Sequence, residues 1–426
     1  MHRRGPTAAD SPQAPTAPFA ALLSAGGGLA VANVYYAQPL LHQIGAGLHM
    51  RVQDLGLATA VTQLGYLLGL ALIVPLGDLI DRRLLIVGQA LLAACGLVAA
   101  GLSTSAAGFL AAGAVVGLAC SVVQVIVAYA AALSPAERRG RTVGVVTGGV
   151  VTGILLARTV SGSIALLLGW RAVFLLSAAL MLAMAAVLGR RLPRERHGPA
   201  RPAYRRLVVS VFALTARDHT FRVRSILAAL MFGGFGALWG SMALPLSAAP
   251  WHLTSAQIGL FGIAGAAGAF GARGAGRLAD AGRAHVVTGT SLTLLLAAWA
   301  AIRAAPFSLV LLALGVVVFD LAGQALHVTN QHLIVERDPL AASRLIGGYM
   351  LYYSLGTGGG AIAATRLYSL AGWNAVCAFG AGLSALALLV WSSDRLRSRH
   401  RPERRRADDP PPHPHPRPVP TDQGAS

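Results

Sequence analysis

The sequence predicts an all-α integral membrane protein with twelve transmembrane helices, arranged as two pseudo-symmetric six-helix bundles. Of its 426 residues, 55% are hydrophobic and only 12% are charged, whereas a soluble domain carries about 25% charged residues. Apolar runs of about 20 residues, long enough to cross a bilayer as helices, recur along the whole chain. One pattern of residues also occurs twice, which predicts two copies of one structural unit.

The apolar runs define the predicted spans and the segments between them. The predicted spans cover approximately residues 20–42, 55–76, 84–103, 106–132, 142–166, 171–189, 225–248, 255–276, 285–304, 307–333, 345–370 and 374–392. They divide the chain into a disordered tail, an N-terminal bundle, a central loop, a C-terminal bundle and a second disordered tail, over residues 1–18, 19–189, 190–224, 225–392 and 393–426. Apolar residues on one helical face of the central loop predict a helix on the membrane surface, with a flexible linker as the alternative.

The repeated pattern consists of residues that are identical at a constant separation of 203 positions. The first copy consists of Arg141, Gly144, Gly153, Gly169, Trp170, Ala172 and Val173. The second copy consists of Arg344, Gly347, Gly356, Gly372, Trp373, Ala375 and Val376. Because this offset maps the fifth span onto the eleventh, we expect two parallel copies, which is typical of one group of transporters.

The charge of the chain predicts its topology. The formal net charge is +19, and all 35 basic residues are Arg. If the N-terminus is cytoplasmic, all but five arginines fall in cytoplasmic loops or tails, as the positive-inside rule requires. The exceptions lie in outer loops or within spans: Arg51, Arg158, Arg171, Arg303 and Arg366. The sequence therefore predicts that both termini are cytoplasmic, and no nucleic-acid partner is expected.

Two predicted cytoplasmic loops share the motif Gly-x-Leu-x-Asp followed by Arg. An Asp in this position can cap the next helix and pair with a nearby Arg. The motif residues are Gly77, Asp78, Asp81, Arg82 and Arg83 in the first loop, and Gly276, Asp280 and Arg283 in the second.

These loops resemble the signature loop of the major facilitator superfamily, and the resemblance covers about residues 20–392. The resemblance implies the fold of that family, transport by alternating access, and a cytoplasmic latch formed by the loops. The second loop departs from the motif, because Arg277 and Ala281 stand at the positions of Asp78 and Arg82.

The fifth span carries a stripe of small residues that resembles the antiporter motif of the same superfamily. The stripe and its repeat consist of Gly144, Gly153, Ala157, Ser161, Gly162, Gly347, Gly356 and Gly360. Arg158 stands where the motif has Pro. Small residues let helices approach closely, so ordinary helix packing is the alternative interpretation. The segment Ala32–Leu41 of the first span resembles bacterial efflux-type members, including drug:proton antiporters and arabinose exporters, which implies a bacterial cytoplasmic (inner) membrane.

Asp320 is the only acidic residue deep in a predicted span. Burial favours the neutral form of a carboxyl group, so we expect Asp320 to exchange a proton with a central cavity. His327, on the same helical face, is the candidate for a second titrating or hydrogen-bonding group. The alternative is that Asp320 forms a permanent ion pair with Arg158 or Arg366 and holds the bundle together.

The resemblance also implies that the first, fourth, seventh and tenth spans line a central cavity between the bundles. Arg158 is a candidate partner for an anionic group of the substrate or for Asp320. The candidate substrate-cavity residues are Asn33, Tyr35, Tyr36, Gln38, Gln124, Arg158, Gln324, Asn330 and Gln331.

Together, these features predict proton-coupled export of a small organic molecule, such as a drug-like compound, a sugar or a metabolite. Proton-coupled uptake is the alternative, and a non-transporting membrane protein is a distant one. The chain carries no metalloprotease, hydrolase or phosphate-loop motif, so no enzyme activity, metal or cofactor is predicted, and the proton gradient is the expected energy source. The expected partners are the lipid bilayer, the substrate and protons, and the expected state is a monomer.

Overall fold

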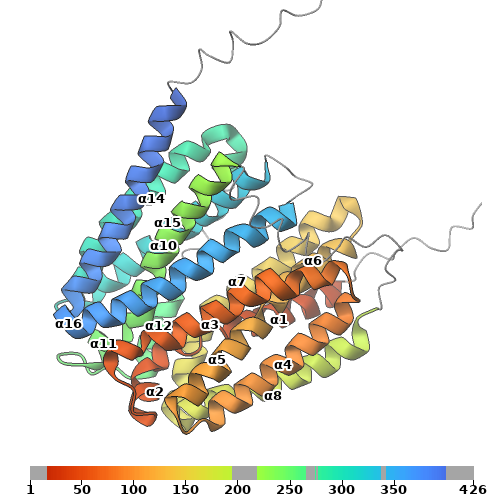
Figure 1. The fold of residues 1–426 in the computed structure, drawn as a ribbon, viewed down its shortest axis with the longest axis horizontal. Helices are drawn as coiled ribbons and strands as arrows, with labels where there is room; N and C mark the ends of the chain where they lie inside the picture. The colour runs from red at the N-terminus through yellow and green to blue at the C-terminus, as the bar shows by residue number, and fades with distance from the viewer. Residues whose placement is uncertain (1–16, 194–217, 265–273, 275–276, 337–341, 400–426) are drawn as a thin grey trace, which may run out of the picture.

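The computed structural model describes residues 17–193, 218–264, 274, 277–336 and 342–399. Every element in this part of the chain is helical, which confirms the predicted fold class (Figure 1). Most of both predicted tails and of the central loop, including the predicted surface helix, lies outside the described residues.

The N-terminal bundle contains six predicted spans, several of which consist of more than one helical segment. Its elements are α1 (Ala17–Ala32), η1 (Gln38–Leu40), α2 (Leu41–Gly47), η2 (Val52–Asp54), α3 (Gly56–Leu68), η3 (Gly69–Ile73), η4 (Val74–Asp78), α4 (Arg82–Leu102), α5 (Ala106–Cys120), α6 (Val122–Ala132), α7 (Ala136–Leu168) and α8 (Trp170–Arg191).

The C-terminal bundle is also built from helical segments. Its elements are α10 (His219–Ser241), α11 (Ala243–Ser247), α12 (Ser255–Ala264), η5 (Ala279–Arg283), α14 (Ala284–Arg303), α15 (Leu309–Val335) and α16 (Ala342–Arg399). In the described residues, nine stretches are long and apolar enough to cross a membrane, and Leu345–Arg397 contains two spans because α16 breaks at Gly372. The shorter α1 and α12, which reaches the edge of the described residues, correspond to the two other predicted spans.

The duplication is visible in the backbone. Gly169 has a φ of 82°, and Gly372, its counterpart in the repeat, has a φ of 71°. Residues with a side chain rarely adopt this left-handed conformation, so both sharp turns require glycine. Trp170 and Trp373, which follow the two turns, are both buried. The repeated Gly-Trp pair therefore marks the same turn in each bundle.

The helix α10 begins before the predicted boundary at residue 225, inside the predicted central loop. The side chain of Asp218 caps it by accepting a hydrogen bond from the backbone N–H of Phe221 at 3.0 Å. Its first turns bury Arg224, which donates to Thr288 Oγ1 at 3.1 Å and to Asn330 Oδ1 at 3.3 Å. The sequence predicts this boundary too late, because Arg224 follows several loop arginines but is a buried residue of the bundle.

The small-residue stripe brings helices into backbone contact within each bundle. A Cβ atom added to Gly153 would lie 2.1 Å from Gly28 O in α1. At the repeat position, a Cβ atom on Gly356 would lie 2.3 Å from Ala229 O in α10. Only glycine fits such contacts, so α7 packs directly on α1 as α16 packs on α10.

The members of the stripe differ in their surroundings. A Cβ atom on Gly360 would lie 2.0 Å from a backbone oxygen of α10. Ala157 and Ser161 are buried. In contrast, an added Cβ atom would meet no described atom within 4 Å at Gly144 or Gly347. The stripe therefore holds glycines that are required by packing and glycines that are not.

The two bundles meet at the end of the molecule where α7 ends and α12 begins, near the labels α2, α11 and α12 in Figure 1. Ser255 Oγ donates to Gly162 O at 3.2 Å, which joins α12 to α7. The backbone N–H of Gly56 donates to Thr365 Oγ1 at 3.2 Å, which joins α3 to α16. We call this region, defined by these four residues, the closed end.

Substitution of Gly162 by Val is expected to open the closed end. A Cβ atom at this position would lie 2.3 Å from Ser255 O, so the bundles cannot meet there without moving apart. We expect a cysteine placed at Gln43, which donates to Ser255 Oγ at 3.1 Å, to become more accessible to a membrane-impermeant maleimide. Gly144→Val is the matched control and should leave labelling unchanged; equal labelling of both variants would contradict the prediction.

Candidate functional site

A break in the first span positions the polar residues at the centre of the molecule. The sequence predicted a continuous helix over residues 20–42, but α1 ends at Ala32 and η1 begins at Gln38. Asn33 Nδ2 donates to Leu29 O at 3.0 Å, and Pro39 has no N–H to continue the helix. Discontinuous helices of this kind commonly form binding sites in transporters.

Arg158, in the middle of α7, reaches this break. Its side chain is only 2% exposed. Its Nε donates to Gln38 Oε1 at 2.8 Å. Its guanidinium carbon lies 3.7 Å from the ring centroid of Trp239 in α10 and 5.2 Å from that of Tyr35. The cation therefore lies between the two bundles, where aromatic faces stabilise it.

Asp320, on α15, contacts the N–H edge of the same indole and is 3% exposed. Trp239 Nε1 donates to Asp320 Oδ1 at 3.5 Å. Asp320 interacts electrostatically with Arg158, but in the described part of the chain the two side chains form no direct ion pair. Arg366, the other predicted partner, is exposed. Trp239 thus links the acid and the cation, one through its N–H and the other through its ring.

Two hydrogen-bond donors of this cluster have no partner among the described residues. They are Arg158 Nη2 and Gln38 Nε2, and both atoms are buried. Both side chains line a cavity of about 10 Å³, together with Pro39, Trp239, Met242, Ala243 and Ile258. A cavity of this size holds about one water molecule. The two donors therefore belong to side chains that line a space that is nearly closed in this conformation.

A tyrosine pair lies beside the cluster and joins the two bundles. The hydroxyl groups of Tyr35 and Tyr353, from the first and eleventh spans, are hydrogen-bonded to each other. The ring of Tyr353 packs against Phe232 of α10. Residues of both halves therefore enclose Arg158.

The other polar residues of the tenth span have separate partners. His327 Nδ1 lies 3.0 Å from the hydroxyl of Tyr349, and Gln331 Nε2 lies 3.3 Å from His327 Nε2. His327 is two helical turns, about 10 Å, from Asp320 along α15, and Gln324 is half-buried between them. The structure thus places His327 apart from Asp320, and Asn330 is held by Arg224 as described above.

Three of the predicted cavity residues face the interior of the N-terminal bundle. Asn33 Oδ1 accepts a hydrogen bond from Ser177 at 2.6 Å, and Tyr36 also interacts with Ser177. Gln124 Nε2 donates to the hydroxyl of Tyr66 at 3.4 Å. The structure therefore brings Tyr35, Gln38, Arg158 and Asp320 together and leaves these three residues outside the cluster.

The predicted latch loops lie at the end opposite the closed end. Asp81 caps α4 by accepting from Arg83 N at 3.0 Å, and Arg83 also donates to Gly189 O of α8. Gly77 lies in η4 next to Arg82. In the second loop Arg283 is exposed. Gly276 and the side chains of Asp78 and Asp280 lie outside the described part of the chain.

Sequence reasoning did not identify Trp239 or Arg224. A tryptophan in the middle of a span is unusual, because indole rings favour the membrane surface, and this signal could have pointed to Trp239. For Arg224 the sequence offers no signal, since its position close to other arginines is typical of a loop.

Residues 23–339 match the family model of the Major Facilitator Superfamily. The chain is 42% identical over 370 residues to the uncharacterized transporter YgaY of Escherichia coli O157:H7, covering 87% of this chain and 94% of that protein. It is 26% identical over 260 residues to the inner membrane transport protein YnfM of Escherichia coli K12, covering 61% and 62% of the two chains.

A similar fold occurs in the crystal structure of a bacterial homolog of the human lysosomal transporter Spinster, in an inward-facing and occupied conformation. The TM-score is 0.71 at 16% identity, and the match covers 89% of this chain and 96% of that chain. The family match, the relative at 42% identity and the fold agree. The chain is a membrane transporter that belongs to the major facilitator superfamily.

Proposed function

We propose that this transporter moves a small organic anion together with a proton. The observation that carries the proposal is the pair of buried, unpartnered donors, Arg158 Nη2 and Gln38 Nε2, on two side chains that line one cavity. A buried donor without an acceptor is costly, so the site is suited to a ligand that supplies acceptor oxygens. A guanidinium recognises a carboxylate or a similar planar anion through parallel hydrogen bonds.

The proton is carried by Asp320. The carboxylate of Asp320 and a bound anion both interact with Arg158, so each weakens the electrostatic attraction between Arg158 and the other. Protonation of Asp320 removes this competing negative charge and strengthens binding of the anion. By reciprocity, bound anion favours protonation of Asp320. Anion and proton therefore bind cooperatively.

Cooperative binding favours transport of the proton and the anion in the same direction. Across a bacterial membrane with an inward proton gradient, that direction is uptake. The sequence favoured export, and a specific observation supports export as the second candidate. Gly153 and Gly162 of the antiporter-like stripe make the close contacts that such a stripe requires, and Gly162 lies at the interface of the bundles. In export, proton and substrate would compete for the site rather than bind together.

Transport requires the bundles to rock about the central cluster. The cavity at Arg158 admits about one water molecule in this conformation, so a substrate enters only after the bundles separate. The arginine distribution supports an inner-membrane protein with both termini cytoplasmic. In that orientation the closed end faces outward, and the loop from Gly77 to Arg83 acts as a latch at the cytoplasmic end.

The direction is tested in membrane vesicles that overproduce the full chain. A panel of radiolabelled organic acids is offered to right-side-out and to everted vesicles, with an imposed pH gradient. We expect accumulation in right-side-out vesicles with an acidic exterior, and collapse of that accumulation by a protonophore. Accumulation only in everted vesicles with an acidic interior would support export instead. A gradient-driven signal that is restricted to organic cations would contradict the anion assignment.

A further inference from the structure

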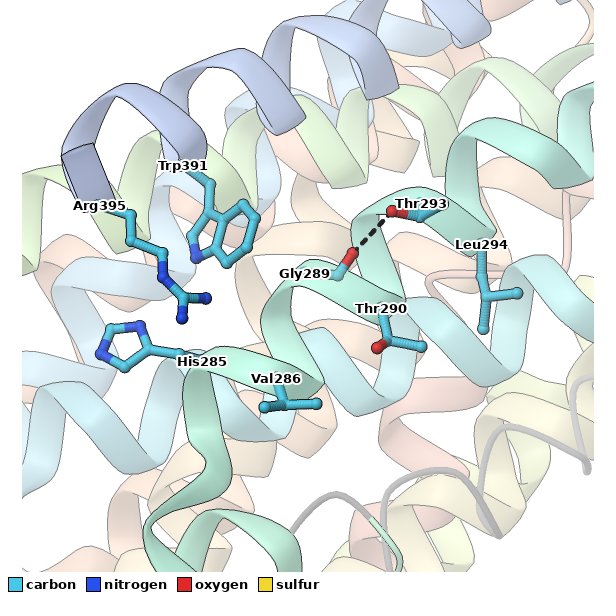
Figure 2. Close-up of a pocket in the computed structure, with 8 residues that line it drawn as sticks. All are labelled: His285, Val286, Gly289, Thr290, Thr293, Leu294, Trp391 and Arg395. Atoms are coloured by element: carbon cyan, nitrogen blue, oxygen red, sulfur yellow. Dashed lines mark hydrogen bonds between the residues drawn. The ribbon is translucent and has the colours of Figure 1, made fainter.

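A groove of about 480 Å³ lies between the first turns of α14 and the last turns of α16, away from the central cluster. Figure 2 shows the side chains that line it. They are His285, Val286, Gly289, Thr290, Thr293, Leu294, Trp391 and Arg395. The groove therefore combines one cationic end with a mainly apolar wall.

Three side chains, one of them the cationic Arg395, lie at this end of the groove. In Figure 2, Arg395 reaches from α16 toward the imidazole of His285 on α14, with the indole of Trp391 beside it. The guanidinium carbon of Arg395 lies 5.4 Å from the ring centroid of Trp391. Trp391 Nε1 is buried and has no hydrogen-bond partner among the described residues. The guanidinium of Arg395, the imidazole of His285 and one unpartnered N–H donor thus converge on one spot.

The neighbouring acid, Asp394, is not among the residues that line the groove. Asp394 Oδ1 lies 2.7 Å from His219 Nε2 on α10. In the described residues, Arg395 forms no ion pair with a carboxylate. His285 interacts electrostatically with Arg224, Arg395 and Asp394. The end of the groove is therefore suited to an anion.

The apolar wall runs from this end toward the middle of the membrane. Successive turns of α14 contribute Val286, then Gly289 and Thr290, then Thr293 and Leu294. The hydroxyl of Thr293 donates to Gly289 O at 3.0 Å, so it satisfies its hydrogen bond within the helix. From His285 to Leu294 the helix rises about 14 Å, close to the roughly 15 Å thickness of one hydrocarbon leaflet.

We propose that this groove binds one anionic phospholipid. The phosphate is held between Arg395, His285 and the N–H of Trp391, and an acyl chain lies along α14 as far as Leu294. The order of the lining residues, with positive charge at the membrane surface and apolar surface deeper, matches the orientation of a lipid in the adjacent leaflet. Basic pockets between transmembrane helices commonly hold anionic headgroups. A small soluble anion would use only the cationic end.

The proposal is tested on the purified full chain in detergent, with bound lipid counted by native mass spectrometry. Phosphatidylglycerol is compared with phosphatidylcholine of the same acyl chains. We expect the wild type to retain phosphatidylglycerol at least about tenfold more tightly than the Arg395→Gln variant. Thr290→Trp, which fills the apolar wall, should also weaken retention. Arg397→Gln is the matched control, because Arg397 is exposed near the same end of α16 and does not line the groove.

A second arm adds glycerol 1-phosphate as a soluble competitor, which we expect to displace phosphatidylglycerol only weakly. Equal retention of phosphatidylglycerol by the wild type and Arg395→Gln would overturn the proposal, as would equal retention of phosphatidylcholine. Full displacement by glycerol 1-phosphate would also overturn it, because the site would then be one for free phosphate esters. None of these outcomes bears on transport through the central cluster.

Discussion

Replacement of Arg158 by Gln is expected to abolish concentrative transport. Arg158 is the buried cation of the central cluster, its side chain lines the cavity, and one of its donors has no acceptor among the described residues. Loss of one partner of a buried, hydrogen-bonded charge pair costs about 2–5 kcal/mol, so substrate affinity should fall by roughly 30-fold or more. Affinity is measured by equilibrium binding of the transported acid to the purified protein.

The matched control is Arg366→Gln, which also removes one arginine from a predicted span. Arg366 is exposed and lies outside the cluster, so its loss should change affinity by less than about threefold. Unchanged binding in Arg158→Gln would show that the anion does not bind at this site. The pair of variants therefore separates a specific loss from a general effect of charge.

A double variant distinguishes a binding role of Arg158 from a structural pair with Asp320. If the two residues only hold the bundles together, removal of both charges in Arg158→Gln/Asp320→Asn should restore folding and transport, because no unpaired buried charge remains. If Arg158 binds substrate, the double variant should fold but remain inactive. Thermal unfolding and transport, measured on the same preparation, give the two readouts.

The fold was predictable because its determinants are periodic and local. The apolar runs, the constant offset between Gly169 and Gly372 and the distribution of arginines each depend on composition or spacing alone. A lipid-exposed segment must satisfy its backbone hydrogen bonds internally, and an apolar run of about 20 residues does so as a helix. Length and polarity are therefore enough to place the spans. The start of α10 was misplaced because burial of Arg224 depends on Thr288 and Asn330, which are distant in the sequence.

The centre of the site was only partly predictable. A charge or acid within a span is visible in the sequence, so Arg158 and Asp320 could be named without a structure. The sequence gives no information on which side chain contacts both of them, because that depends on how α10 packs against α7 and α15. Asn33, Tyr36 and Gln38 are all polar residues of one short segment, so the sequence does not separate them. In the structure the chain breaks before η1, so that Gln38 contacts Arg158 while Asn33 and Tyr36 contact Ser177.

Replacement of Asp320 by Asn is expected to uncouple transport from the proton gradient. Asn is neutral and nearly isosteric with the protonated acid, so the variant resembles the state that binds the anion. Accumulation driven by a pH gradient should fall to the equilibrium level, whereas exchange of labelled for unlabelled substrate should continue. Accumulation and exchange are measured in proteoliposomes with an imposed pH gradient.

The pH dependence of binding gives the sign of the coupling. In the wild type, deprotonation of Asp320 restores a negative charge next to Arg158, so affinity for the anion should fall as pH rises; in Asp320→Asn, affinity should not depend on this step. Asp54→Asn is the matched control, because Asp54 pairs with the exposed Arg51 at 3.0 Å, away from the cluster. An affinity that rises with pH in the wild type and is flat in Asp320→Asn would show that proton and substrate compete for the site. This result would support export. Unchanged pH dependence and full accumulation in Asp320→Asn would exclude this carboxyl group from coupling. Asp320 is the one buried acid at the centre of the cluster among the described residues, so the proposed coupling would then have no carrier there.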